Sequence, residues 1–285
     1  MQNILITGAS TGIGYHTTKL FLEKGYGVLG SVRKKEDADR LKNDFGDHFH
    51  PLIFDVNDQE GINRAVEEAQ QILSGKGLAC LVNNAGIVVS GPLQHLSVEE
   101  LQQQFDTNVF GVLRVSQAFL PFLGAQIPAK YPAGKIVNIS SVSGFVTAPF
   151  MGAYAMSKYA LESMSDAFRR ELSIYDIDVV VIEPAAVSTD IWSKAKSLDP
   201  KFLDTDYGTI LKNWDRMVDN SEKNGVPPDD VAQKIYTSVV AKKPSTRYIV
   251  AKKKMVMKLV KYVFSDRFLD KQLTKSFKRK VKEKD

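Results

Sequence analysis

The apolar residues of this chain gather in short runs that alternate with longer amphipathic stretches. Runs this short and this continuously apolar are typical of strands that are buried on both faces of a sheet. They predict strands at Asn3 to Thr7, Gly27 to Val32, Pro51 to Phe54, Ala79 to Val82, Lys135 to Ile139, Val179 to Ile182 and Tyr248 to Val250.

Between these runs, apolar positions recur with the period of a helix. The predicted helices are Ile13 to Lys24, Gln59 to Leu73, Val98 to Phe105, Thr107 to Leu123, Gly152 to Ser173 and Pro228 to Ala241. Parallel strands need crossover connections, and crossover helices cover both faces of the sheet. The alternation therefore predicts an α/β protein with a doubly wound parallel sheet, the Rossmann fold, in a single domain over residues 1–251.

The last part of the chain has a different character. Residues 252–285 contain thirteen Lys or Arg against four Asp or Glu, a balance of +9, so residues 1–251 carry −4 of the chain's net +5. Because the excess of basic charge belongs to the tail, we expect no nucleic-acid binding by the main domain. The tail is predicted to be a basic helical extension, with a second basic stretch from Lys271 to Lys284.

An amphipathic helix is predicted within Lys252 to Phe264. Its apolar residues fall on one helical stripe among lysines: Met255, Val256, Leu259, Val260 and Val263. Such a stripe can pack against the main domain or a partner subunit, or it can lie on an anionic membrane surface. We favour packing, because many helices on globular domains share this pattern.

Composition limits the remaining possibilities. With 44% hydrophobic residues, the 285-residue chain can bury one large core. The first strand begins at Asn3, which leaves no room for a signal peptide, so we expect a cytoplasmic protein. The single cysteine, Cys80, and four histidines without metal-ligand spacing beyond the weak pair His48 and His50 give no expected metal site.

Three glycines follow the first strand and lead directly into a helical pattern. Their spacing is Gly8-x-x-x-Gly12-x-Gly14. Glycines permit a tight turn and let the backbone approach a pyrophosphate at a helix N-terminus. The backbone amides of Ser10, Thr11, Gly12 and Ile13 are therefore expected to bind a diphosphate.

Tyr154 and Lys158 are four residues apart, so on a helix they share one face. A phenol has a reference pKa of about 10, which is too high for ready proton exchange near neutrality. An adjacent ammonium favours the phenolate and lowers that pKa. Tyr154 is thus a candidate acid for protonating a carbonyl oxygen, or a candidate base in the reverse direction.

Together with the glycine turn and the pair Tyr154 and Lys158, four further segments resemble the short-chain dehydrogenase/reductase family. They are Asn83-Asn84-Ala85-Gly86, Asn108, Asn138-Ile139-Ser140-Ser141 and Pro184 to Thr189, and the resemblance covers nearly everything from residue 3 to residue 190. It implies a nicotinamide dinucleotide cofactor and, commonly in the family, a homodimer or homotetramer. Residues 190–226 would then be the helical lid of the substrate pocket, the alternative being an ordinary surface insertion.

The resemblance also implies roles for single residues. Ser141 would hold the substrate oxygen, with Ser140 as second choice, and Asn108 would help to hold Lys158 through water. Asp55 would bind the adenine amino group, and Asn84, Ala85 and Gly86 would lie beside the adenosine ribose. Val187 and Thr189 would reach the nicotinamide carboxamide, although Ala185 replaces the family's usual glycine in that loop.

The choice between NAD and NADP depends on the end of the second strand. No acid occupies Ser31 or Val32, where an NAD enzyme offers a carboxylate to the ribose hydroxyl. The guanidinium of Arg33 can instead pair with the 2′-phosphate of NADP, and Lys34 adds positive charge. We therefore expect NADP, with NAD as the alternative.

The function predicted from these residues is NADP(H)-dependent hydride transfer between the nicotinamide and a secondary alcohol or ketone. The extended C-terminus resembles family members that act on steroids, retinoids or other apolar carbonyl compounds. Two alternatives remain: a catalytically silent nucleotide-binding sensor or scaffold, and an NAD-dependent alcohol dehydrogenase. The four catalytic residue types favour an enzyme, because a pure binder does not need Tyr154 and Lys158.

Overall fold

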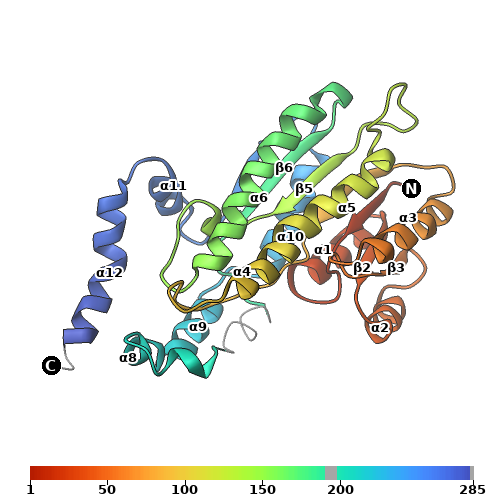
Figure 1. Ribbon diagram of the computed structural model, residues 1–285. Helices are drawn as coiled ribbons and strands as arrows, with labels where there is room; N and C mark the ends of the chain where they lie inside the picture. Colours follow the sequence, from red (N-terminus) through yellow and green to blue (C-terminus); the bar gives the residue numbers. More distant parts are fainter. Residues whose placement is uncertain (190–197, 283–285) are drawn as a thin grey trace.

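Seven parallel strands form one sheet in the computed structural model of the chain, which describes residues 1–189 and 198–282 (Figure 1). The strands are β1 (Asn3–Ile6), β2 (Gly27–Val32), β3 (Phe49–Ile53), β4 (Leu78–Asn83), β5 (Lys135–Ile139), β6 (Asp178–Pro184) and β7 (Arg247–Val250). Their spatial order is β3-β2-β1-β4-β5-β6-β7, with every neighbouring pair parallel. The predicted doubly wound α/β fold is confirmed.

The sequence places each strand to within about two residues. Shifts of two residues occur at the start of β3, which begins at Phe49 where the prediction began at Pro51, and at the end of β6, which reaches Pro184 where the prediction ended at Ile182. β3 is the edge strand of the sheet, so His50 and Pro51 are partly exposed there and the buried run is interrupted. Pro is tolerated at a sheet edge because one side of the strand needs no hydrogen-bond donor.

Helices cover both faces of the sheet (Figure 1). They are α1 (Gly12–Glu23), α2 (Lys35–Phe45), α3 (Gln59–Leu73), α4 (Val98–Phe105), α5 (Gly111–Phe119), α6 (Gly152–Glu171), α8 (Gly208–Leu211), α9 (Trp214–Lys223), α10 (Pro228–Val240), α11 (Lys254–Tyr262) and α12 (Asp266–Lys282). α2 is absent from the prediction because its apolar side is narrow: only Ala38 and Leu41 are buried among its many charged residues.

The core is divided by the sheet into two layers. In β1, Ile4 and Ile6 face one layer and Leu5 faces the other, as the two-residue period of a strand requires. α1 and α10 pack against each other on the first side, and α3 and α5 pack on the second. Cys80 lies fully buried in the first layer, and burial raises the pKa of its thiol.

A single stretch of helix replaces the two helices predicted on either side of residue 106. A π-helical turn at Asp106–Phe110 joins α4 to α5, and a 3₁₀ turn at Leu120–Leu123 ends the stretch. π-turns insert one extra residue per turn and frequently occur at functional sites. Here the turn carries Asn108, which is buried.

The predicted lid is partly described. Its residues 190–197 lie outside the described residues, and residues 198–226 form a 3₁₀ turn at Pro200–Phe202 followed by α8 and α9. Together with Phe150 and Met151, which precede α6, they build a third apolar cluster that includes Phe202 and Trp214.

The C-terminal extension consists of α11 and α12 (Figure 1); residues 283–285 lie outside the described residues. Four of the five stripe residues, Met255, Val256, Leu259 and Val263, are exposed in the chain by itself. The main domain therefore does not cover this apolar stripe, contrary to the packing on the main domain that the sequence favoured. A different side of α11 packs on the main domain instead. Among the described residues, no helix is long and apolar enough to cross a membrane.

Candidate active site

A cavity of about 520 Å³ opens at the carboxyl ends of the central strands. Small-molecule sites of roughly 300–1,000 Å³ are usual in proteins, and ligands of doubly wound sheets bind at this edge. Its lining includes nearly all the residues predicted for the site: Gly8, Ser10, Thr11, Gly12, Ile13, Arg33, Asp55, Asn84, Ala85, Gly86, Ser141, Tyr154, Lys158, Val187 and Thr189. Gly14 and Asn108 are the exceptions, and both lie behind the lining.

The glycine turn forms a cradle that side chains would fill. Gly8 and Gly12 have φ angles of +67° and +54°, in the left-handed region that favours glycine. At Gly14 the reason is close packing, since a Cβ there would lie 2.1 Å from the carbonyl oxygen of Gly8. Ser10, Thr11, Gly12 and Ile13, where the turn enters α1, line the cavity.

Asn84 holds this turn in place. Its Nδ2 donates to the carbonyl oxygens of Thr7 at 2.9 Å and Gly8 at 3.1 Å. Its backbone amide donates to Oγ1 of Thr7, as does that of Ala85. Thr7 and Asn84 thus join the ends of β1 and β4, which fixes one wall of the cavity.

The predicted adenosine end carries opposite charges. Nη1 of Arg33 lies 4.0 Å from Oδ2 of Asp55, and both side chains are well exposed. Asp37, which also lines the cavity, is paired with Arg40 at 2.9 Å, and Arg40 donates further to the carbonyl oxygen of Ser10. Within the part of the chain that the structure describes, Arg33 thus has one distant, exposed acidic partner, and it lines the cavity.

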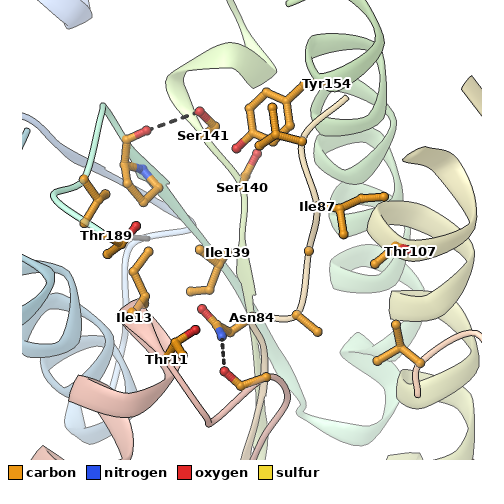
Figure 2. Close-up of a pocket in the computed structure, with 18 of the residues that line it drawn as sticks. Thr11, Ile13, Asn84, Ile87, Thr107, Ile139, Ser140, Ser141, Tyr154 and Thr189 are labelled. Carbon is orange, nitrogen blue, oxygen red and sulfur yellow. Dashed lines mark hydrogen bonds between the residues drawn. The ribbon is translucent and has the colours of Figure 1, made fainter. Parts of the chain in front are cut away.

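Ser141 and Tyr154 face the other end of the cavity (Figure 2). Ser141 follows β5 and caps a short 3₁₀ turn at Val142–Gly144, its Oγ accepting from the amide of Ser143. The same hydroxyl donates to the carbonyl oxygen of Pro184 at 3.4 Å. The neighbouring Ser140 has a buried hydroxyl without a hydrogen-bond partner among the described residues.

Lys158 lies one helical turn after Tyr154 in α6, on the same side. Its Nζ donates to the carbonyl oxygen of Ile139 at 2.8 Å and lies 5.6 Å from the centre of the Tyr154 ring. The side chain is buried. The sequence prediction that these two groups meet on one helix face is therefore confirmed.

The pKa values differ from the sequence expectation. Burial raises the pKa of Tyr154 to about 12, against a smaller lowering by its hydrogen bond with Ser141. Burial lowers the pKa of Lys158 to about 8, with the Glu162 carboxylate opposing the shift. The expected lowering of the Tyr154 pKa is thus not found in the chain alone, because loss of solvent disfavours the charged phenolate.

Asn108 supports the site from behind. Its Oδ1 accepts from the amide of Ile87 at 2.9 Å, and its Nδ2 donates to the carbonyl oxygen of Ile87 and to Oγ of Ser157, both at 3.1 Å. Ser157 precedes Lys158 in α6. The side chain therefore joins the π-turn to the cavity wall at Ile87 and to the helix that carries Tyr154, and it is not a helix cap.

The segment after β6 closes the cavity over the glycine turn. Thr189 lies directly over Gly12: a Cβ atom added to Gly12 would be 3.3 Å from both the Cβ and the methyl group of Thr189. Val187 forms an isolated bridge with Val226, and Oγ of Ser188 donates to the carbonyl oxygen of Glu222. The predicted nicotinamide loop is thus fixed to the end of α9.

Two supporting residues were missed by the sequence reading. Oγ of Ser31 accepts from the amide of Gly8 at 3.1 Å, and Gln104 makes two hydrogen bonds to the backbone of Ile87 and Val89. A sequence signal existed for Ser31, which is a polar residue within an apolar run, whereas the burial of Gln104 appears only in the folded chain. Among the described residues, no group of three or more His, Cys, Asp or Glu side chains could hold a metal ion.

Comparison with known proteins identifies the family. The family model "short chain dehydrogenase" matches residues 2–199. The chain belongs to the short-chain dehydrogenase family. It is 46% identical over 283 residues to an "NADPH-dependent 3-dehydrocapnine reductase" of Ornithobacterium rhinotracheale, covering 99% of this chain and 100% of that protein.

Two further matches extend this result. A "3-ketodihydrosphingosine reductase" of Bacteroides thetaiotaomicron is 32% identical over 248 residues, with 86% of each chain covered. A crystal structure of a short-chain dehydrogenase from Streptomyces avermitilis has the same fold, with a TM-score of 0.76 at 24% identity, covering 98% of this chain and 97% of the other. This short-chain dehydrogenase is accordingly an oxidoreductase that acts with NAD(P).

The residues present fit a nicotinamide dinucleotide. The glycine turn and the residues at the start of α1 line one end of the cavity, and backbone amides at a helix N-terminus suit a diphosphate. The lining continues from there to Ser141, Tyr154 and Lys158 at the opposite end. The short-chain dehydrogenase therefore has one continuous surface for a diphosphate, a ribose and a reacting ring.

Proposed function

We propose that this short-chain dehydrogenase reduces a ketone on a long-chain, lipid-like substrate with NADPH. The observation that carries the proposal is the meeting of Ser141, Tyr154 and Lys158 in the same cavity as the glycine cradle. A protein that only senses a nucleotide needs the cradle but not the tyrosine and lysine pair.

The two hydroxyl groups define where the substrate oxygen binds. Ser141 and Tyr154 both line this end of the cavity, so a carbonyl oxygen placed beside their two hydroxyl groups could accept a hydrogen bond from each, once Ser141 donates to it in place of the Pro184 carbonyl. The Ser141 hydroxyl would orient the carbonyl and stabilise its developing negative charge. Tyr154 would donate the proton to the carbonyl oxygen, while a bound NADPH would supply the hydride.

Lys158 would keep the tyrosine supplied with protons. An ammonium whose pKa is about 8 exchanges protons readily near neutrality, and it attracts the phenolate that forms when Tyr154 has given up its proton. Asn108 would position this pair through Ser157, the residue before Lys158. The role that we predicted for Asn108, holding Lys158 through water, stays a prediction.

Arg33 supports NADPH as the preferred cofactor. It lies at the rim of the cavity at the end of β2, next to Lys34, and Asp37 nearby is already paired with Arg40. A phosphate on the adenosine ribose would therefore meet two cations and an acid whose charge is largely satisfied. The relative from Ornithobacterium, described as NADPH-dependent, supports the same preference.

Apolar side chains beside the tyrosine support a lipid-like substrate. Tyr154 packs against the third apolar cluster, to which Phe150, Phe202 and Trp214 belong. The names of two relatives, a 3-dehydrocapnine reductase and a 3-ketodihydrosphingosine reductase, also describe reductases of 3-oxo compounds. Residues 198–226 would act as the substrate lid. A cytoplasmic location and a homodimer or homotetramer stay predictions.

Absorbance of the nicotinamide tests the proposal directly. The purified chain is mixed with NADPH or NADH and a panel of long-chain 3-oxo compounds, with short water-soluble ketones as a comparison. We expect oxidation of NADPH that is fastest with the long-chain compounds. Tight binding of NADPH without turnover of any carbonyl would favour a silent sensor, and faster turnover with NADH would favour an NAD-dependent dehydrogenase.

A further inference from the structure

Helix α11 presents a continuous apolar face to solvent. Met255, Val256, Leu259, Tyr262 and Val263 have exposed fractions between 40% and 70%. These positions recur at the spacing that puts residues on one side of a helix. Apolar faces of this kind usually mark a surface that binds something else.

The opposite side of α11 is fixed to the body of the protein. Met257, Val260 and Lys261 are partly buried there, and α11 packs on β7. Lys261 forms an ion pair with Glu183, which is buried in β6, and its Nζ lies 4.7 Å from the centre of the Phe145 ring. The helix is therefore held with its apolar face outward.

Lysines accompany this face. Lys252, Lys253, Lys254 and Lys258 are exposed, and none has an acidic partner in the part of the chain that the structure describes. No Asp or Glu occurs from residue 252 to residue 265. Long lysine side chains can extend to phosphate groups while neighbouring apolar side chains enter the boundary with the acyl chains.

The face lies close to the substrate end of the sheet. Phe145, which Lys261 contacts, follows the short turn that Ser141 caps, and α12 contacts α8 in the predicted lid. Figure 1 shows α12 standing apart from the sheet and extending toward α8. A surface that binds α11 would thus be next to the lid residues.

We propose that α11 docks on an anionic lipid surface through this apolar face and its four lysines. A second copy of the chain is a poorer occupant, because a symmetric contact between two α11 faces would bring the two lysine groups together. Lipid phosphates neutralise those charges at about the depth where the apolar residues would insert. The docking does not depend on the proposed reaction, although a lipid-like substrate would come from the same surface.

Sedimentation with vesicles tests the docking. The full chain is mixed with vesicles of phosphatidylcholine and phosphatidylglycerol, and separately with vesicles of phosphatidylcholine alone. We expect binding to the mixed vesicles only, and weaker binding as salt rises, because the charges are exposed to solvent. Absence of binding to the mixed vesicles at low salt would overturn the proposal.

Two pairs of variants separate the apolar from the charged contribution. The double variant Leu259→Glu, Val263→Glu should lose more than about tenfold in vesicle affinity, whereas Ile174→Glu, at a site that is 67% exposed on another part of the surface, should lose little. Lys254→Gln with Lys258→Gln should lose roughly 25-fold in vesicle affinity, since each lysine near an anionic surface contributes about a factor of five. The control is the double variant Lys76→Gln, Lys242→Gln, which changes two exposed lysines elsewhere on the surface and should lose little vesicle affinity.

Two further measurements make the result unambiguous. Binding of NADPH by each variant shows that the chain is folded, and turnover of a short water-soluble ketone reports on the proposed reaction without any vesicle. Equal vesicle binding by wild type and the Leu259→Glu, Val263→Glu variant would contradict the proposal. A different oligomeric state of this variant, measured by sedimentation without lipid, would also contradict the proposal, because it would show that the apolar face of α11 binds a second copy of the chain.

Discussion

The Lys261 ammonium of the C-terminal extension forms an ion pair with the fully buried carboxylate of Glu183, the residue directly before Pro184 at the end of β6. A second cation, Arg247, has its Nε 3.7 Å from the same carboxylate and is also paired with Glu162 and Asp166. The extension thus neutralises an acid at the edge of the sheet where the carbonyl oxygen of Pro184 accepts from Ser141.

We expect Lys261→Met to destabilise the chain by about 3 kcal/mol near neutral pH, since removing one partner of a buried pair leaves an uncompensated charge. Thermal unfolding measures the change. Lys258→Met, which removes an exposed lysine one turn away, is the matched control and should have little effect. A Lys261→Met chain as stable as wild type would show that Arg247 alone neutralises Glu183.

This destabilisation should depend on pH. Burial raises the pKa of Glu183, and Lys261 opposes that rise. Without Lys261, the pKa of Glu183 in the folded chain rises further. Above the pKa of an ordinary glutamate, the unfolded chain then releases a proton that the folded chain retains. The stability of the Lys261→Met chain therefore falls as pH increases through this range. The difference between wild type and Lys261→Met should therefore be small near pH 4 and grow toward pH 7. A difference that is constant over this range would argue for lost packing instead.

Tyr154→Phe tests the proton donor. The change removes only the hydroxyl, so we expect carbonyl reduction to fall by roughly 10²–10⁴-fold, the usual contribution of general acid catalysis. Calorimetric binding of NADPH should be nearly unchanged. Tyr159→Phe in the same helix, where the ring is 45% exposed, is the control and should keep full activity. Unimpaired turnover by Tyr154→Phe would refute the proposed mechanism.

The pKa of Lys158 gives the direction of the pH dependence. Burial lowers this pKa to about 8, so the ammonium loses its proton as pH rises through that value and no longer stabilises a phenolate. In the free enzyme, kcat/KM for reduction should therefore decline above about pH 8. Lys158→Arg keeps the charge at all these pH values, so any activity that it retains should lack this decline.

Sequence patterns predicted the sheet and the cavity lining well, because both depend on local signals. Buried strands are short and apolar, and the glycine spacing fixes the turn. The orientation of α11 could not be predicted in this way, since Glu183 and Lys261 are far apart in the sequence and their pairing selects the side that packs. The pKa of Tyr154 was mistaken for a similar reason: its burial depends on tertiary packing, whereas its spacing from Lys158 is local.

A comparison of Gly14→Ala with Gly25→Ala separates the effect of a steric clash in the glycine turn from the effect of backbone strain. The new Cβ would lie 2.1 Å from the carbonyl oxygen of Gly8 and 2.6 Å from Nδ2 of Asn84, so the turn must open. We expect a loss of NADPH affinity of at least about tenfold, because the amides that face the diphosphate move with the turn. Gly25→Ala is the matched control: its φ is +81° with no atom within 4 Å of the new Cβ, so it should cost about 1 kcal/mol of stability without changing affinity. If both variants bind NADPH as wild type does, the cradle is not the diphosphate site.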